Sequence, residues 1–167
     1  TNNIGTVGGG IGTEITGSYL RFGERIDLLP ELAQVLHQQK FYDVSNNSWG
    51  FTQAFADNFS TSTFARVKNA LQTAVSEGRD GLGTVMVMAA GNGKLVTSAG
   101  NIGDDSNFHN LSNSRFVIAV GAHDANGTPA SFSSPGTNVL LTAPGVGLLT
   151  TSGGTAGSQA VAYVSGT

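Results

Sequence analysis

Two short, almost wholly apolar runs constrain what this chain can fold into more than any other feature. The first, TVMVMAA, spans residues 84–90, and the second, FVIAV, spans residues 116–120. Both runs are too short for a helix, and an unbroken apolar run of this length is typical of a strand buried in a parallel sheet. The sequence therefore predicts a parallel sheet at the centre of the fold.

One helix is predicted with clear boundaries ahead of the first apolar run. Ser60 or Thr61 caps its start, and Gly78 ends it. Its apolar residues keep the spacing of one helical face, and they are Phe64, Val67, Leu71, Ala74 and Val75. An earlier helix is predicted from a cap at Asp27 through residue 36.

The remaining strands are shorter and are predicted from alternation and from Gly and Pro punctuation. Asn126-Gly127 is a hairpin signal, because a tight primed turn needs positive φ at both central residues. A further short strand is expected to end within residues 46–50. Strands are also expected over residues 13–22, 130–132, 139–142, 148–151 and 160–164. This order of elements predicts an α/β domain with right-handed crossovers.

Composition excludes several classes of protein. Only 11% of the 167 residues are charged and the net charge is −3, so we expect no basic face and no nucleic-acid partner. The longest apolar stretches fall far short of the roughly 20 residues that a membrane-spanning helix needs, so no membrane segment is expected. The absence of cysteine excludes disulfides, thiolate metal sites and a cysteine nucleophile.

Common catalytic motifs are missing from the chain. No G-x-S-x-G or H-E-x-x-H segment occurs, and the glycine-rich residues 8–12 lack the lysine of a phosphate-binding loop. His37 lies within a predicted helix, His123 follows a predicted strand, and His109 lies in a polar loop near Asp104. None of these histidines is predicted to act as a general base, since that role requires a favourable geometry first.

Three segments place small polar residues at the ends of predicted strands. They are DVSNNSWG at residues 43–50, VMVMAAGNG at residues 85–93 and AYVSGT at residues 162–167. Open α/β sheets form their sites at the carboxyl ends of the strands, so these segments are expected to meet. An extended peptide can pair with the backbone of residues 48–50, and Asn92 can aim its amide into the same cleft. The alternative for Asn92 is an ordinary turn residue before a glycine.

These segments, in this order and spacing, resemble the subtilisin-like serine proteases. FVIAVGAHDANGTPASFSSPG at residues 116–136 and VLLTAPG at residues 139–145 extend the resemblance over nearly the whole chain. The kexin-like branch is the more similar one, because of SWG at residues 48–50, GNG at residues 91–93 and DDSNFHNLSNSRF at residues 104–116.

The resemblance implies a subtilisin-like parallel sheet flanked by helices, incomplete at both ends. Residues 1–167 would form the central and C-terminal-side part of one peptidase domain. The opening TNNIGTVGG is similar to the loop that follows the catalytic-histidine helix, and the closing SGT is similar to the residues before the catalytic serine. The Asp, His and Ser of the triad would then lie outside the chain. We expect a serine endopeptidase in the parent protein and no activity in the isolated chain.

The resemblance also implies roles for individual residues. Asn92 matches the oxyanion-hole asparagine, whose amide donates to the tetrahedral oxyanion. Two segments match the walls of the substrate pocket, and their residues are Ser48, Trp49 and Gly50 on one side and Ala90 and Gly91 on the other. Trp49 is equally compatible with an ordinary core position, because aromatic side chains bury large areas.

Calcium is the metal that the resemblance implies. Asp104, Asp105 and Asn107 would supply oxygen ligands suited to a hard cation, and the alternative is a solvated acidic loop. Kexin-like enzymes read basic residues with acids near the pocket. Gln53 and His109 occupy two of those acidic positions here, so dibasic specificity is not carried over.

The resemblance further implies peptide or protein substrates and a secreted or extracellular protein. Self-association is expected of the isolated chain, because an incomplete sheet exposes apolar surface. Two other functions stay open from the sequence. One is a catalytically inactive peptide-binding module with the same fold. The other is a nucleotide-binding domain, which would need a glycine fingerprint directly after its first strand, and none is present.

Overall fold

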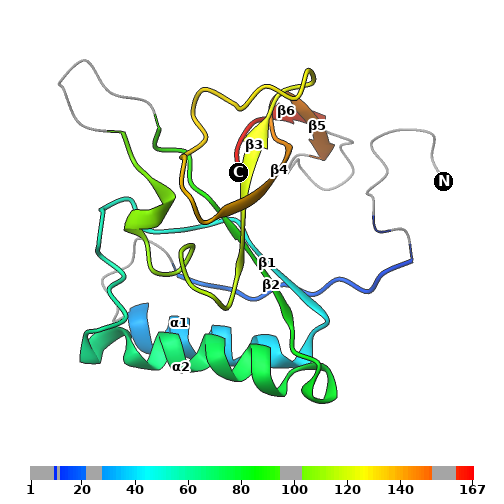
Figure 1. The fold of residues 1–167 in the computed structure, drawn as a ribbon. Helices are drawn as coiled ribbons and strands as arrows, with labels where there is room; N and C mark the ends of the chain where they lie inside the picture. The colour runs from blue at the N-terminus through cyan, green and yellow to red at the C-terminus, as the bar shows by residue number, and fades with distance from the viewer. Residues whose placement is uncertain (1–9, 11, 22–27, 95–102, 152–160) are drawn as a thin grey trace.

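A four-stranded parallel sheet forms the centre of the computed structural model, which describes residues 10, 12–21, 28–94, 103–151 and 161–167 (Figure 1). The strands follow one another across the sheet in chain order. They are β1 (Val44–Asn47), β2 (Val85–Ala89), β3 (Ile118–His123) and β4 (Val139–Pro144). Each neighbouring pair is parallel, which confirms the prediction drawn from the apolar runs.

A separate two-stranded antiparallel sheet follows β4. It consists of β5 (Leu148–Thr151) and β6 (Val161–Val164), with Leu149 opposite Tyr163 in its register. Both strands were expected from the sequence, except that residue 160 lies outside the described part of the chain.

Two helices pack against each other on one side of the parallel sheet (Figure 1). They are α1 (Leu28–Gln38) and α2 (Ser62–Glu77), and short 3₁₀ turns occur at Gln39–Phe41, Arg79–Gly81 and Ser106–Phe108. Thr61 caps α2, since its Oγ1 accepts a hydrogen bond from the Phe64 N–H at 3.4 Å. The other expected cap, Asp27, lies outside the described residues. No helix within those residues is long and apolar enough to span a membrane.

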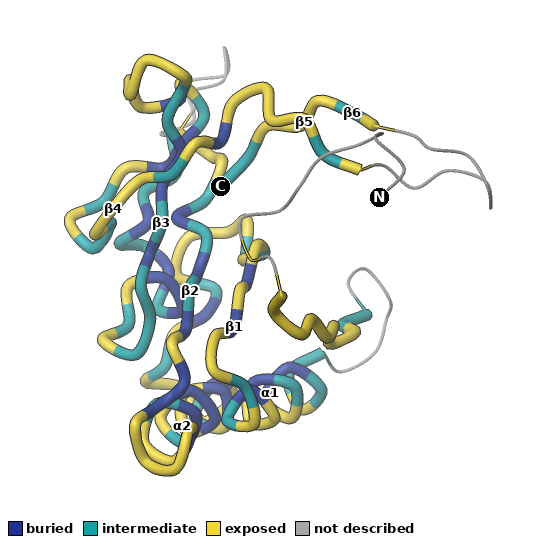
Figure 2. The backbone as a smooth tube through the Cα atoms, turned by 90° about the vertical axis from the view of Figure 1, so that its right-hand side faces the viewer, coloured by how far each residue is buried: buried dark blue, intermediate teal, exposed yellow. Residues whose placement is uncertain are grey.

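The hydrophobic core lies between these helices and the facing side of β1 and β2 (Figure 2). Alternate residues of β2 point into it, so that Met86 and Met88 are buried. The inward residues of β1 are polar, and the Asn47 Nδ2 donates to Ser45 Oγ at 2.9 Å and to the Val87 carbonyl at 3.3 Å. The helical side of the core comprises Leu32, Ala33, Leu36, Phe64, Val67, Ala70, Leu71 and Ala74.

Two of the expected strands are absent from the described residues. Residues 13–21 are extended but unpaired, with Ile15 91% and Tyr19 76% exposed, because alternation alone cannot form a strand without a neighbour. Residues 130–132 form no strand, since residues 131 and 132 lie in a turn, and among the described residues an isolated β-bridge joins Pro129 to His123 of β3.

The Asn126-Gly127 signal marks a chain reversal of another type than expected. The Gly127 N–H donates to the Asp124 carbonyl at 3.1 Å, which places Asn126 and the residue before it at the centre of the turn. Within this turn, residues 124–128, only Gly127 has a positive φ, +80°. Asp124 Oδ1 also accepts from the N–H groups of Asn126 and Thr128, each at 2.9 Å, so a side-chain cap stabilises the turn.

Candidate active site

A cavity of about 850 Å³ lies at the carboxyl ends of β1 and β2. The residues that follow β1 line it together with those that follow β2. All six residues that the sequence singled out for an oxyanion hole or a substrate pocket are among them: Ser48, Trp49, Gly50, Ala90, Gly91 and Asn92. The topology therefore brings these two segments, 40 positions apart in the chain, to one site.

The side chain of Asn92 is oriented by Thr167. Its Oδ1 accepts hydrogen bonds from the backbone N–H and from the hydroxyl of Thr167, both at 3.0 Å. The Gly91 N–H donates in turn to Thr167 Oγ1 at 3.3 Å, so this hydroxyl accepts from Gly91 and donates to Asn92. An amide nitrogen could not accept these bonds, which fixes the orientation of the carboxamide. Its Nδ2 has no hydrogen-bond partner among the described residues and is available as a donor.

Ser134 holds the loop that carries Asn92. Its backbone N–H donates to the Gly91 carbonyl at 2.8 Å, and its Oγ accepts from the Gly93 N–H at 3.1 Å. Gly91 has a φ of +111°, and a Cβ at this position would lie 2.8 Å from Ser134 Oγ. Glycine is therefore required at position 91 both for its backbone conformation and for the space beside Ser134.

Trp49 lies both in the core and on the cavity wall, the two alternatives that the sequence left open for it. Its ring packs against the hydrophobic core and also lines the cavity. The Nε1–H donates to Asn47 Oδ1 at 3.2 Å, which ties the ring to the end of β1. Gly50 is exposed, and its backbone N–H and carbonyl make no hydrogen bond to the described residues. This segment therefore offers open backbone beside the cavity.

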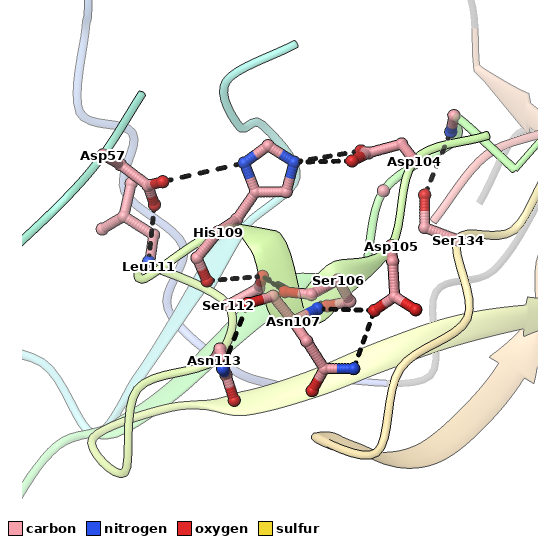
Figure 3. A network of polar contacts seen from close by, with 12 residues as sticks. Asp57, Asp104, Asp105, Ser106, Asn107, His109, Leu111, Ser112, Asn113 and Ser134 are labelled. Atoms are coloured by element: carbon pink, nitrogen blue, oxygen red, sulfur yellow. Dashed lines mark hydrogen bonds and ion pairs between the residues drawn. The ribbon is translucent and has the colours of Figure 1, made fainter. Parts of the chain in front are cut away.

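Three polar residues on the cavity wall form a cluster that the sequence did not predict (Figure 3). The His109 ring lies between two carboxylates, with Nε2 at 2.9 and 3.1 Å from the two oxygens of Asp104. On its other side, Nδ1 lies 3.7 Å from Asp57 Oδ1, an ion-pair distance that is too long for a hydrogen bond. Asp57 is fully buried, and its Oδ2 accepts from the Leu111 N–H at 2.7 Å.

One sequence signal could have identified Asp57. It is the only charged residue between Asp43 and Arg66, and it stands between Phe55 and Phe59. A lone carboxylate in such an apolar segment requires a partner if it is buried. Its partner His109 is 52 positions further along the chain, so that spacing within the segment could not identify it.

The three residues expected to bind calcium do not converge on one point. Asp104 directs both oxygens to His109, whereas Asp105 Oδ1 accepts from the backbone and side-chain N–H groups of Asn107 at 2.8 and 2.7 Å. Asn107 Oδ1 accepts from Thr137 Oγ1 at 3.0 Å. No group of three or more His, Asp or Glu side chains suited to a metal occurs within the described residues. These residues therefore do not fit a calcium site.

Other candidates lie away from the cavity. Gln53 is exposed and does not line it, although both of its chain neighbours do. His37 is exposed on α1, and His123 Nδ1 lies 2.7 Å from the Asp124 carbonyl oxygen. His109 is thus the one histidine of the chain that lines the cavity.

Comparison with known proteins gives a consistent result. The sequence model of the subtilase family, Peptidase S8, matches residues 13–167. Protease KEX1 of Kluyveromyces lactis is 31% identical over 140 residues, covering 84% of this chain and 17% of the relative. The dibasic-processing endoprotease of Yarrowia lipolytica is 33% identical over 146 residues, covering 84% of this chain and 14% of the relative.

Solved structures show the same fold. A protease from Pseudoalteromonas arctica superimposes with a TM-score of 0.59 at 27% identity, covering 80% of this chain and 40% of that one.

The chain spans about a sixth of the length of the two curated relatives named above. The family match over residues 13–167 and the two relatives agree, and the chain belongs to the subtilase family.

Proposed function

We propose that this chain supplies the oxyanion donor and the substrate-binding walls of a subtilisin-like serine endopeptidase. The observation that carries the proposal is the orientation of Asn92, whose carboxamide oxygen is held by two donors from Thr167 while its Nδ2 remains available. A preoriented donor of this kind stabilises the negative charge that develops on a carbonyl oxygen during acyl transfer. Family membership supports the same chemistry.

The substrate is an extended peptide held beside β1. Gly50 offers unpaired backbone groups next to the cavity, and a peptide can use such groups as an additional strand. Ala90 and Gly91 form the neighbouring wall, and the absence of a side chain at Gly91 leaves the space that Ser134 occupies beside it. The nucleophilic serine, its histidine and the aspartate would come from other parts of the parent protein, so the isolated chain is expected to be inactive.

Replacement of Asn92 tests the proposal in the complete enzyme. Asn92→Ala should lower kcat by about 10²–10³-fold with little change in KM, a magnitude known from subtilisin itself rather than derived from this structure. Asn126→Ala is the matched control, since Asn126 also precedes a glycine, is exposed and lies away from the cavity. Equal activity of the two variants would contradict the role of Asn92.

A fluorophosphonate probe separates the endopeptidase from its alternative. An active serine nucleophile in the complete protein should be labelled covalently, and peptide hydrolysis should be lost after labelling. Peptide binding without labelling or turnover would instead identify an inactive peptide-binding module. Sustained turnover by the isolated 167-residue chain, purified free of other proteases, would contradict its expected inactivity.

Two further expectations rest on family resemblance. We propose that the parent protein is secreted, and its activity in culture medium rather than in cell extract would test this. Calcium, when bound to such a protein, supplies structural support through hard oxygen ligands. Since Asp104, Asp105 and Asn107 are engaged with other partners, no step of the mechanism is assigned to a metal at these residues.

A further inference from the structure

The loop that carries Asn92 continues beyond the end of the parallel sheet. The backbone ladder between β2 and β3 ends with the Ala90 N–H, which donates to the Val120 carbonyl at 3.0 Å. After this bond, Asn92 stands between Gly91 and Gly93. Glycine has the widest choice of backbone conformations, so a side chain between two glycines keeps a fixed position only if other parts of the chain restrain the loop.

Ser134 restrains this loop on both sides of Asn92. Its backbone N–H donates to the Gly91 carbonyl at 2.8 Å, and its Oγ accepts from the Gly93 N–H at 3.1 Å (Figure 3). Ser134 is only 2% exposed, so water competes little for these bonds. A single buried residue therefore bridges the two glycines that flank the proposed oxyanion donor.

These two bonds fix the backbone torsions of Asn92. The Gly91 carbonyl belongs to the peptide group before the Asn92 Cα, and the Gly93 N–H belongs to the peptide group after it. Because peptide groups are planar, the φ and ψ of Asn92 are set once both groups are held. The direction in which the side chain leaves the backbone is then fixed as well. The bonds from Thr167 to Asn92 Oδ1 orient the carboxamide at the other end of the side chain.

Ser134 is not among the residues that line the cavity, whereas Gly91, Asn92 and Gly93 are. An effect of Ser134 on the reaction must therefore pass through the loop. We infer that Ser134 is a positioning residue, which holds the Asn92 amide at the point where negative charge develops in acyl transfer. The inference rests on the proposed endopeptidase function. A preorganised donor acts through its position, so a small displacement lowers the rate.

Ser134→Ala in the complete enzyme tests the inference. It removes the hydroxyl acceptor and keeps the backbone bond to Gly91. Since Gly93 is exposed, water can solvate its freed N–H, and we expect the variant to fold. Its kcat should fall by about 10–10²-fold with little change in KM, the range for a misplaced catalytic group. Active enzyme is counted by complete fluorophosphonate labelling, so that unfolded protein does not lower the measured kcat.

Ser133→Ala is the matched control. Ser133 is the adjacent serine, is 8% exposed and also accepts a backbone N–H, that of Ala122 on β3 at 3.0 Å. This change leaves the buried Ala122 N–H without its partner, so it should lower the melting temperature at least as much as Ser134→Ala does. It should keep kcat close to the wild-type value. An equal loss of kcat in both variants would assign the effect to stability and overturn the inference.

A double variant shows whether Ser134 acts through Asn92. Asn92→Ala combined with Ser134→Ala should have the kcat of Asn92→Ala alone, since a positioning residue has no effect once the amide is gone. Losses that multiply would overturn the inference. A lowered kcat in Asn92→Ala beside an unchanged kcat in Ser134→Ala would overturn the inference and leave the proposed function standing. An unchanged kcat in Asn92→Ala would overturn both.

Hydrogen exchange in the wild-type enzyme decides the question if Ser134→Ala does not fold. Gly93 is exposed, so an unbonded amide at this position would exchange at the rate of a free peptide. With the bond to Ser134 Oγ in place, exchange should be slower by about tenfold or more. Deuterium uptake resolved to single residues measures this. Exchange at the free-peptide rate would overturn the inference.

Discussion

The two ends of the molecule bury their apolar residues to very different degrees (Figure 2). Where α1 and α2 cover β1 and β2, residues such as Leu36, Val67 and Leu71 have no exposed surface. In β5 and β6, by contrast, Leu149 is 43% and Tyr163 76% exposed. Leu148 and Leu149 are neighbours on one strand and so point to opposite faces, yet both are exposed. Neither face of this small sheet is covered by the described residues.

This difference in burial indicates that one region stabilises the chain and that the other helps to position the site. The helix-covered region supplies a core that holds β1 and β2 in register, and the cavity opens at the ends of these two strands. The β5–β6 sheet contributes little burial but leads the chain back to Thr167, which orients Asn92. Stability should therefore depend on the first region, whereas surface behaviour should depend on the second.

The largest effect is expected from truncating the helix-covered core. Leu71→Ala removes a side chain with no exposed surface and should lower the free energy of unfolding by about 2–5 kcal/mol, through lost burial and the cavity left behind. Leu149→Ala makes the same chemical change in β5 and should cost no more than about 0.5 kcal/mol. Urea denaturation of both variants measures the difference. Similar losses would show that the β5–β6 sheet is packed as well as the core.

Two glycines with a positive φ, one in each region, allow the helix-covered core and the β5–β6 sheet to be compared through backbone substitutions. Gly83 connects α2 to β2 with a φ of +85°, and a Cβ there would collide with the Val75 carbonyl oxygen. Gly147 precedes β5 with a φ of +62°, and a Cβ there would meet nothing within 4 Å. Gly83→Ala should cost at least about 2 kcal/mol, whereas Gly147→Ala should cost only the strain of a left-handed residue, about 1–2 kcal/mol. Thermal denaturation that ranks Gly147→Ala as the worse variant would contradict this.

Sequence reasoning succeeded where local pattern and tertiary structure agree. The apolar run at residues 84–90 became β2, and the periodic residues from Phe64 to Val75 became the buried face of α2, because both buried surfaces are continuous in sequence. It failed at residues 13–21, where alternation is present but no strand among the described residues pairs with the segment. A strand requires a partner, and alternation along one segment does not reveal whether a partner exists.

The candidate site was predictable only in part, for the same reason. The rule that sites form at the carboxyl ends of parallel strands was enough to place Ser48 and Asn92 in one cleft in advance, whereas the roles of the two walls came only from the family resemblance. The contact between Asp57 and His109 depends on how two loops pack against each other, and no periodicity encodes that. The orientation of Asn92 by Thr167 likewise joins residues 75 positions apart.

A smaller effect is expected at the solvent-exposed start of the helix-covered region. Thr61→Ala removes the hydroxyl that caps α2, and it should lower the free energy of unfolding by about 0.5–1 kcal/mol because the capping distance of 3.4 Å is long. Thr63→Ala is the control within the same turn. It is exposed, makes no cap and should be neutral or slightly stabilising, since alanine has the higher helix propensity. If Thr63→Ala lowered the free energy of unfolding more than Thr61→Ala, the assignment of Thr61 as the cap would be wrong.

Substitutions in β5 and β6 should change the free energy of unfolding least. They should clearly change the association of the chain with itself. Leu149 and Tyr163 lie opposite each other on adjacent strands and are both exposed, so they present one apolar face. Exposed apolar faces of this kind promote association, and we expect the isolated chain to form concentration-dependent oligomers through this face. Sedimentation velocity over a range of concentrations measures this.

A double variant tests whether this face is responsible. Leu149→Thr with Tyr163→Thr introduces β-branched residues that suit a strand and allows a cross-strand hydroxyl contact. It should shift the chain toward monomer while changing the free energy of unfolding by no more than about 0.5 kcal/mol. Val44→Thr is the control, because Val44 is 60% exposed on β1, in the helix-covered region. If Val44→Thr abolished association and the double variant did not, the open surface that governs self-association would lie along β1, beside the proposed substrate-binding segment.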